Sequence, residues 1–224
     1  TMRAFIQKLT KVLVKVLTSN TWAFVFLPKG YSFDQALVVF AFGTFKNFSV
    51  LQSSIHEVWA KWNPSTMKSD TRYTIASCFL TFPMPYDNDI LEIVGENYYQ
   101  HRNNIMQTNH EGLTKLYNRF HFPEDTSKDI QRLRDMHIEL DRSVANAYNW
   151  NDLELEHGFR ETQQGIRFTI SEEARREVLQ RLLKLNHERY AEEVTQGLHN
   201  KKKGKRSIKS ISSSKPSNSE LKLF

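Results

Sequence analysis

Residues that can donate hydrogen bonds to phosphates or bases gather between positions 54 and 73. His56 and Trp59 are three residues apart and share one face of an expected helix. A polar turn follows, with basic side chains and an aromatic ring at the point where it enters an expected strand. Surfaces that bind nucleic acid use these residue types. We therefore predict that the following side chains contact DNA: Ser54, His56, Lys61, Lys68, Arg72 and Tyr73.

Some of these residues have a structural alternative that the sequence leaves open. Trp59 also suits a hydrophobic core, with His56 making a buried hydrogen bond beside it. In the other interpretation, His56 and Lys61 reach a phosphate from one edge of the helix. Arg72 can contact DNA or can pair with Asp70 or with an acidic residue further along the chain.

The sequence does not predict catalysis by this chain alone. Asn63–Thr66, Asn-Pro-Ser-Thr, lacks the second proline and the aromatic ring of the Asn-Pro-Pro-Tyr loop that holds a flipped adenine, so we interpret it as a helix-ending turn. No glycine-rich turn joins a strand to a helix, and the histidines are too scattered for a metal site. Asp135, Glu139 and Asp141 near His137 fall on different faces of a helix and predict a solvated charged surface. We expect no catalytic, cofactor-binding or metal-binding residues.

Charge is distributed unevenly along the 224 residues, whose net charge is +6. Residues 1–86 carry 9 Lys and Arg against 3 Asp and Glu, and residues 87–196 carry 14 against 21. Residues 197–224 carry 8 against 1 and have no apolar period, which predicts a disordered basic tail. A surface for a polyanion is therefore expected in the first segment rather than the second.

The expected environment of the chain follows from two absences in the sequence. No apolar run reaches the length of a membrane span, so we expect no membrane partner. A single cysteine, Cys78, excludes a disulfide framework and suits a reducing compartment. We expect a cytoplasmic protein.

Hydrophobic periodicity predicts an α+β fold. Strand patterns occur within residues 10–50, a helical pattern at 48–61 and an extended one at 72–82. A Phe-Pro-x-Pro sequence at 82–85 then predicts a rigid linker.

After this linker the chain is predicted to be mainly helical. Ser171, followed by two glutamates, is expected to cap the last helix. One short strand is expected at 164–170, and helices are expected at 89–106, 112–120, 128–150 and 172–194. The chain is thus divided into a sheet-rich domain (1–86), a helical domain (87–196) and the basic tail (197–224).

Several ordered blocks carry a family resemblance: FSVLQSSIHEVWA, MKSDTRYTIASCFLTFPMP, IVGENYYQHRNNIM, GLTKLYNRFH and LRDMHIELDRSVANAYNW. Over about residues 10–195 the chain resembles the C-terminal region of large adenine-specific DNA methyltransferases. These are single-chain, Type IIG-like Type II restriction–modification enzymes and related phage-defence methylases. Ser53 or Ser54, His56 and Trp59 match the family's Ser-x-x-His-x-x-Trp helix, residues 68–73 match its Lys-Ser-Asp/Arg-Tyr element, and 82–85 match the end of its recognition domain.

This resemblance implies a partial target-recognition domain followed by a helical region. Double-stranded DNA and a methyltransferase domain or subunit are the implied partners. The parent enzyme would use S-adenosylmethionine, but the catalytic domain that binds it has no counterpart here, so we expect no cofactor in this chain and no enzyme activity by itself. The resemblance fits either an excised fragment or a separate subunit.

A different class of function is compatible with the same sequence. The helices can form a protein–protein interaction module that docks onto a separate catalytic subunit, with the basic first segment incidental. The salt dependence of DNA binding distinguishes the two interpretations.

Overall fold

The computed structural model of the protein describes residues 8–62 and 72–198 and has an α+β fold, as predicted from the sequence. Its strands are β1 (Lys11–Val16), β2 (Val25–Pro28), β3 (Leu37–Phe40), β4 (Gly158–Thr162) and β5 (Gly165–Thr169). Its helical elements are α2 (Phe45–Gln52), α3 (Ser54–Trp62), the π-helical turn η1 (Ile75–Phe79), α4 (Ile90–Thr108), α5 (Leu113–His121), α6 (Lys128–Ala147) and α7 (Glu172–Thr195). The helices predicted at 89–106, 112–120, 128–150 and 172–194 are confirmed as α4 to α7.

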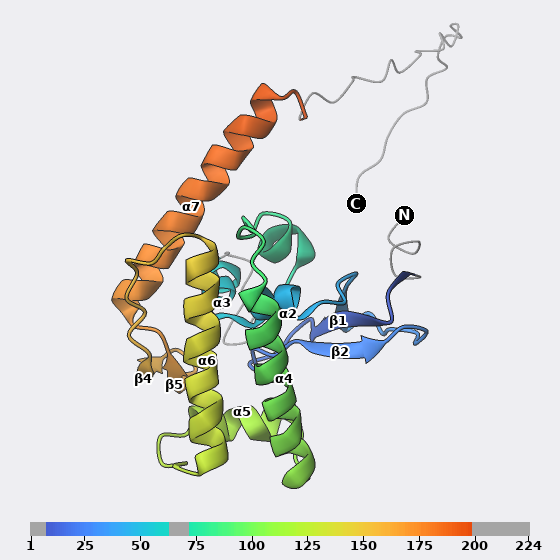
Figure 1. The fold of residues 1–224 in the computed structure, drawn as a ribbon, viewed down its shortest axis with the longest axis vertical. Coiled ribbons are helices and arrows are strands. Elements are labelled where there is room, and N and C mark those ends of the chain that lie inside the picture. Colours follow the sequence, from blue (N-terminus) through green and yellow to red (C-terminus); the bar gives the residue numbers. More distant parts are fainter. Residues whose placement is uncertain (1–7, 63–71, 199–224) are drawn as a thin grey trace, which may run out of the picture. The chain divides into compact units, whose positions relative to one another are not determined.

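The first three strands form an antiparallel sheet in the order β2–β1–β3 (Figure 1). Leu13 in the central strand lies opposite Phe26 of β2 and Phe40 of β3. Val12, Leu13 and Val14 are all buried, so the middle strand is covered on both faces.

The helix predicted at 48–61 is divided in the structure. Ser53 has an extended backbone (ψ 154°), and its hydroxyl donates to the Val50 carbonyl oxygen (2.7 Å) and accepts from the His56 amide (3.3 Å). A serine that bonds to nearby backbone groups competes with helical hydrogen bonding. α2 therefore ends at Gln52 and α3 begins at Ser54.

The prediction of an extended segment at 72–82 is wrong for most of that range. Arg72 forms an isolated bridge with Thr18, but the chain then turns into η1. The amide of Cys78 donates to the Thr74 carbonyl oxygen (2.8 Å), so these backbone groups are satisfied locally rather than by a neighbouring strand. The strand predicted at 164–170 is confirmed as β5, and it pairs with β4, which the sequence did not predict.

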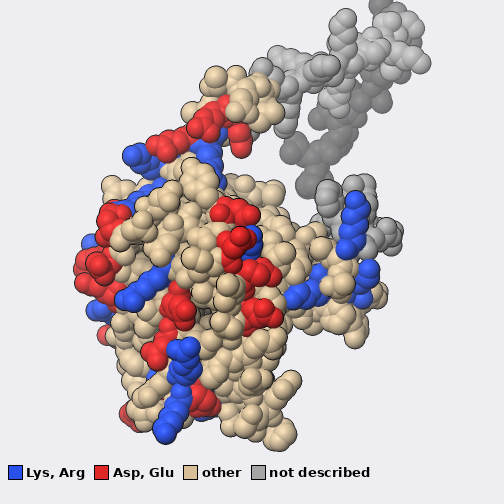
Figure 2. Space-filling view, viewed as in Figure 1, with Lys and Arg blue, Asp and Glu red and all other residues tan. Residues whose placement is uncertain are grey.

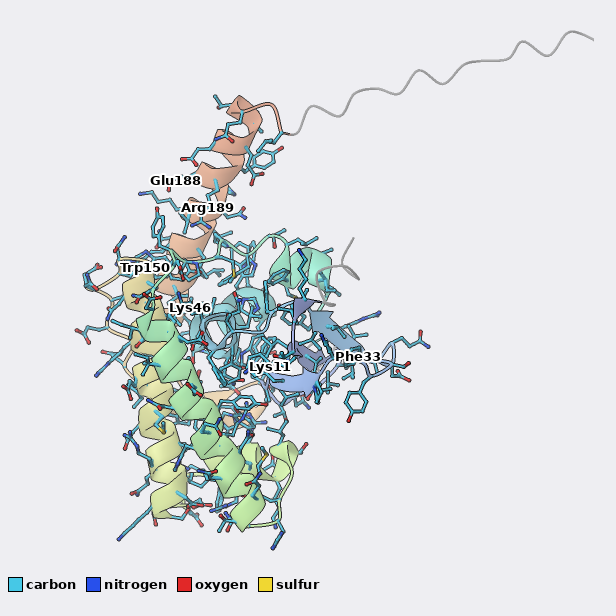
Figure 3. The ribbon with its side chains drawn as sticks, turned by 45° about the vertical axis from the view of Figure 1, so that its right-hand side comes forward. Lys11, Phe33, Lys46, Trp150, Glu188 and Arg189 are labelled. Atoms are coloured by element: carbon cyan, nitrogen blue, oxygen red, sulfur yellow. The ribbon has the colours of Figure 1, made fainter. Side chains whose placement is uncertain are left out.

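The predicted boundary at residue 86 does not separate two cores. The described residues up to Arg189 belong to one compact unit, and a single hydrophobic cluster includes residues from both predicted domains. The Phe-Pro-x-Pro sequence packs into this unit. The Pro83 carbonyl oxygen accepts from the Tyr148 hydroxyl (2.7 Å), and the Met84 carbonyl oxygen accepts from Arg189 (2.7 Å), which is labelled in Figure 3.

A second unit begins at Tyr190. Its described residues are the end of α7 and the turn up to Leu198. The rest of the predicted basic tail lies outside the described residues.

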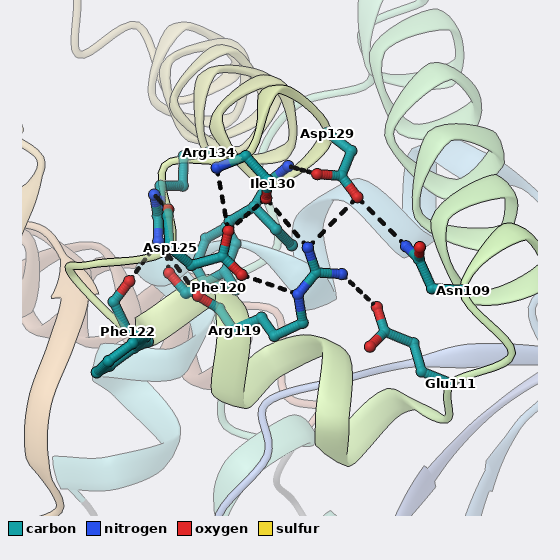
Figure 4. Close-up of polar contacts among 10 residues, drawn as sticks. Asn109, Glu111, Arg119, Phe120, Phe122, Asp125, Asp129, Ile130 and Arg134 are labelled. Carbon is teal, nitrogen blue, oxygen red and sulfur yellow. Dashed lines mark hydrogen bonds and ion pairs between the residues drawn. The ribbon is translucent and has the colours of Figure 1, made fainter.

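Two arginines fix the connection between α5 and α6 (Figure 4). Arg119 pairs with Glu111 (2.7 Å) and Asp125 (2.8 Å). Arg134 donates to main-chain carbonyl oxygens at the end of α5 and in the following loop, including those of Phe120 (2.9 Å) and Phe122 (2.8 Å). These contacts satisfy carbonyl groups that a helix end leaves without partners.

α2 and α4 pack at very close range. A β-carbon at Gly95 would lie 2.2 Å from the Ser49 hydroxyl oxygen and 2.6 Å from the Phe45 carbonyl oxygen. Lys46, labelled in Figure 3, joins the same two elements through Asp87 (3.0 Å) and Asp89 (2.6 Å) just before α4. Glycine is therefore required at position 95 by the helix contact.

We predict that Gly95→Ala lowers the free energy of unfolding by about 1–3 kcal/mol or more, because the new methyl group meets main-chain atoms of α2. Urea unfolding followed by circular dichroism measures the change. Gly112→Ala is the control, since nothing lies within 4 Å of its added β-carbon. Equal losses in both variants would contradict the close contact.

Candidate functional site

Three of the predicted DNA contacts, Ser54, His56 and Tyr73, are buried, with exposed fractions of 2%, 0% and 0%. The His56 Nε2 atom and the Tyr73 hydroxyl share a hydrogen bond of 2.8 Å, and the Phe82 ring lies edge-on to the imidazole with centroids 4.3 Å apart. Because they are buried, these three side chains cannot contact DNA at the protein surface. We therefore correct their assignment to structural residues. The alternative interpretation of Trp59 as core and His56 as a buried hydrogen-bonding group is confirmed.

Burial also keeps the His56–Tyr73 pair uncharged. Removal from water, with a smaller contribution from the positive charge of Lys15, lowers the pKa of His56 to about 3. Burial raises the pKa of Tyr73 as well. The hydrogen bond at neutral pH is thus between two neutral groups.

A second buried polar cluster joins α3, α6 and the segment before β4. Asp141 is 0% exposed and accepts from the Ser54 amide (2.8 Å), while its other oxygen lies 2.8 Å from His157 Nε2 and 3.5 Å from His137 Nε2. Burial by itself would raise the pKa of Asp141, but His137 and the hydrogen bonds from His157 and Ser54 lower it overall. The carboxylate is ionised and held by contacts from three segments.

The predicted solvated face around His137 is only partly correct. Asp135 and Glu139 are exposed, as expected. Asp141 is not, because it occupies the next buried position of α6 after Leu140 and faces the serine and histidine side chains. No pattern in the sequence indicates that His157, sixteen residues further along, completes this cluster.

The cluster contains serine, histidine and aspartate but is not arranged for nucleophilic catalysis. A catalytic histidine contacts the serine through one ring nitrogen and the carboxylate through the other. Here the Ser54 hydroxyl (3.1 Å) and Asp141 (3.5 Å) both face Nε2 of His137, and Nδ1 has no partner within the described residues. The arrangement supports packing rather than acyl transfer.

The other three predicted contacts have different positions. Lys61 pairs with Glu57 (2.6 Å) and lies 3.4 Å from the Gln164 side-chain oxygen. Arg72 is exposed beside the end of β1. Lys68 lies outside the described residues. The structure therefore leaves Lys61 and Arg72 as predicted contacts that a ligand can approach.

A cleft of about 760 Å³ opens beside Lys61. Its wall is formed by α3, α5, the β4–β5 hairpin, the beginning of α7 and the segment around Asn20. Gln164, at the hairpin turn, donates to the Asn20 side-chain oxygen (3.0 Å) and closes the wall between the hairpin and the segment before β2. Thr18, two residues before Asn20, forms the bridge with Arg72. Arg72 is therefore connected through this segment to the cleft wall that contains Lys61 and the hairpin.

Arginines from the hairpin and α7 line this cleft. Arg160 of β4 and Arg167 of β5 are direct cross-strand partners, and Arg175 in the first turns of α7 donates to the Thr169 hydroxyl (2.8 Å). Sequence reasoning missed all three. The available signal was the strand alternation in Gly158–Thr162, followed by Gln-Gln-Gly, with Gly165 at a positive φ of 86° that favours glycine.

Metal sites and membrane-spanning helices are absent from the described residues. Among them, no group of three or more His, Cys, Asp or Glu side chains can hold a metal ion. Within the same ranges no helix is long and apolar enough to cross a membrane. Figure 2 shows acidic and basic side chains interspersed over the helical part of the visible face, whereas the part formed by the three-stranded sheet carries mainly basic ones.

This combination of a small antiparallel sheet with packed helices is a fold found in a restriction-modification enzyme. The solved structure is that of the Type IIL restriction-modification enzyme MmeI in complex with DNA, with a TM-score of 0.58 and 18% sequence identity. The likeness covers 81% of this chain and 22% of the MmeI chain, so the protein spans about a fifth of the length of that enzyme. At this identity the likeness establishes the fold. No protein-family model matches the chain, and no curated protein matches it significantly.

We predict that Asp141→Ala lowers the free energy of unfolding by about 3–5 kcal/mol, because it leaves two imidazoles and the Ser54 amide without their buried partner. Urea unfolding measures the loss. Asp135→Ala on the same helix removes an exposed carboxylate and should change stability by less than about 0.5 kcal/mol. Similar values for the two variants would refute the structural role of Asp141.

Acidification should destabilise the fold through His56. The unfolded chain binds a proton at this histidine near pH 6.5, whereas the folded protein binds it only near pH 3, so the unfolded state holds more protons between these values. The free energy of unfolding should therefore fall as the pH is lowered, by about 2 kcal/mol from this residue between pH 7 and pH 5. Urea titrations at several pH values measure it.

A His56→Gln variant should lose that part of the pH dependence, whatever its stability at pH 7. His187→Gln, which removes an exposed histidine of α7, should keep it. The same slope in the wild type and in His56→Gln would show that His56 is not held neutral by burial.

Proposed function

We propose that this chain is a DNA-binding, target-recognition part of an adenine-specific DNA methyltransferase of a restriction–modification or phage-defence system. The observation that carries the proposal is the fold likeness over 81% of the chain to a restriction-modification enzyme in complex with DNA. The sequence blocks that resemble the C-terminal region of such methyltransferases support it independently. The sequence resemblance extends over about residues 10–195, and the structural likeness covers 81% of the chain.

The proposed DNA-contacting surface is the one that includes Arg72, Lys61 and the cleft wall. Arg72 is exposed and has no carboxylate within 4 Å among the described residues, which do not include Asp70. In this proposal its guanidinium group donates to a phosphate or a base edge. Lys68, the remaining predicted contact, belongs to the same proposal.

In this proposal the chain binds DNA but does not methylate it. S-adenosylmethionine does not fit the described residues well. Both of their sheets are antiparallel, and the connection from β3 to α2 has one glycine, Gly43, whose added β-carbon would already meet Leu9. The cofactor is therefore assigned to the methyltransferase domain or subunit that the family resemblance implies as a partner.

An exposed apolar patch favours a second candidate function, which is docking onto that catalytic partner. Ile90 and Ile93 are three residues apart in the first turn of α4, and Tyr86 precedes them. Their exposed fractions are 56%, 62% and 63%. Large apolar side chains grouped in this way are typical of surfaces that contact another protein.

We predict that the chain binds duplex DNA at low salt and that binding weakens steeply as the salt concentration rises. If three or more phosphates are contacted, the logarithm of the binding constant should fall with the logarithm of the salt concentration with a slope of about −3 or steeper. Fluorescence anisotropy of a labelled duplex measures the slope.

The control for this experiment is a chain that ends at Gln196, because residues 197–224 carry 8 basic residues and can bind any polyanion. DNA binding should survive the truncation with a smaller slope. If the truncated chain shows no affinity for DNA at low salt, the DNA-binding proposal is wrong. Docking onto a catalytic partner would then be the better supported function.

A further inference from the structure

The β4–β5 hairpin places two like charges directly opposite each other. Arg160 and Arg167 are cross-strand partners, so their side chains leave the same face of the hairpin. The neighbouring pair, Phe159 and Phe168, occupies the opposite face, with ring centroids 5.3 Å apart. Opposed like charges destabilise a strand pair, so the arginine pair costs stability in the absence of an anion.

These arginines form no ion pair with a carboxylate in the described ranges. Burial alone would raise the pKa of Glu57, but Lys61 and, to a smaller extent, Arg175 lower it, so Arg175 is within electrostatic range of that carboxylate. Among the described residues, Arg160, Arg167 and Arg175 have no carboxylate within ion-pair distance, whereas Arg119 and Arg181 each pair with at least two. Arg160 donates to the Glu156 carbonyl oxygen (3.2 Å), and Arg167 donates to the Ile166 carbonyl oxygen (3.4 Å). Arg175 donates to the Thr169 hydroxyl (2.8 Å). A guanidinium group has five N–H donors, so most of theirs remain for a ligand.

Four glutamates also line the cleft, but none of them belongs to the arginine face of the hairpin. Glu57 is occupied by Lys61 (2.6 Å), and Glu161 lies on the phenylalanine face of the hairpin. Glu172 pairs with Arg176 (3.4 Å), which leaves Glu173 in the first turn of α7. By strand alternation, the hairpin face that carries Arg160 and Arg167 therefore holds no carboxylate of its own.

We propose that Arg160, Arg167 and Arg175 form a phosphate-binding site that takes the phosphate ester of a nucleotide. Guanidinium groups bind phosphate oxygens in paired hydrogen bonds. The cleft of about 760 Å³ has the size of a small-molecule site, and the aromatic side chains of Trp22 and Tyr117 contribute to its wall. The phosphate comes either from the DNA backbone, which rests on the proposed function, or from a free nucleotide.

The test compares the full-length wild type with Arg160→Gln/Arg167→Gln. Without ligand, the melting temperature of this variant should be equal to or higher than that of the wild type, because two opposed charges are removed. On duplex DNA, loss of two phosphate contacts should make the salt slope shallower by about 1–2. With free dAMP, the melting temperature of the wild type should rise and that of the variant should not if the free nucleotide is the source.

Arg132→Gln/Arg142→Gln is the matched control. It removes the same charge from exposed positions of α6 that do not line the cleft. Its salt slope and dAMP response should remain those of the wild type. The inference also fails if this control and the hairpin variant lose DNA affinity equally.

The two sources and the proposed function can be told apart. A shallower DNA slope without a dAMP effect assigns the site to the DNA backbone, and a dAMP effect that the hairpin variant abolishes assigns it to a free nucleotide. If the wild type binds DNA and the hairpin variant matches it in both assays, the site is wrong while the proposed function stands. If the wild type does not bind DNA, the proposed function fails and the dAMP comparison alone decides the site.

Discussion

The buried guanidinium group of Arg102 is the contact on which the arrangement of the compact unit depends. It is fully buried and donates to the Phe24 carbonyl oxygen (2.8 Å), to the Gln52 side-chain oxygen (3.4 Å) and to the Tyr117 hydroxyl (3.4 Å). A buried charge costs several kcal/mol unless polar groups surround it. Because the partners of this α4 residue belong to the segment before β2, to α2 and to α5, the sheet and the helices must pack together to satisfy it. Gln52 and Tyr117 also line the cleft, so the same network shapes one wall of the candidate site.

Polar residues that look functional in the sequence are divided by burial into two groups. His56, Tyr73 and Asp141 make their hydrogen bonds inside the protein and join different elements. Groups that remain for a ligand lie at the cleft and beside it, where Arg160 and Arg167 have no acidic partner among the described residues. The same residue types thus stabilise the fold in one place and leave a cationic surface in another.

The sequence predicted the helices well because long apolar periods specify them independently of their neighbours. It failed mainly where a tertiary contact decides the outcome. One failure was local: the Ser53 hydroxyl bonds to main-chain groups three residues away and ends a helix, whereas other serines lie inside helices. The other failures were tertiary, since nothing in the pattern shows that Asp141 faces His157 rather than water. The prediction of a domain boundary at residue 86 was wrong for the same reason. The Phe-Pro-x-Pro pattern is typical of a linker, but its carbonyl oxygens accept hydrogen bonds from Tyr148 and from Arg189 of α7. For the site, Lys61 and Arg72 were predicted, but the hairpin arginines depend on a strand pairing that was not.

We propose that DNA contacts the chain at the cleft face, through the hairpin Gly158–Thr169 and the first turns of α7. Hydrogen–deuterium exchange of the full-length protein with and without duplex DNA tests it most directly. We expect slower exchange in peptides that cover the hairpin and the start of α7, with little change in peptides that cover α6. Protection confined to other segments, with the exchange of the hairpin unchanged by saturating DNA, would contradict it.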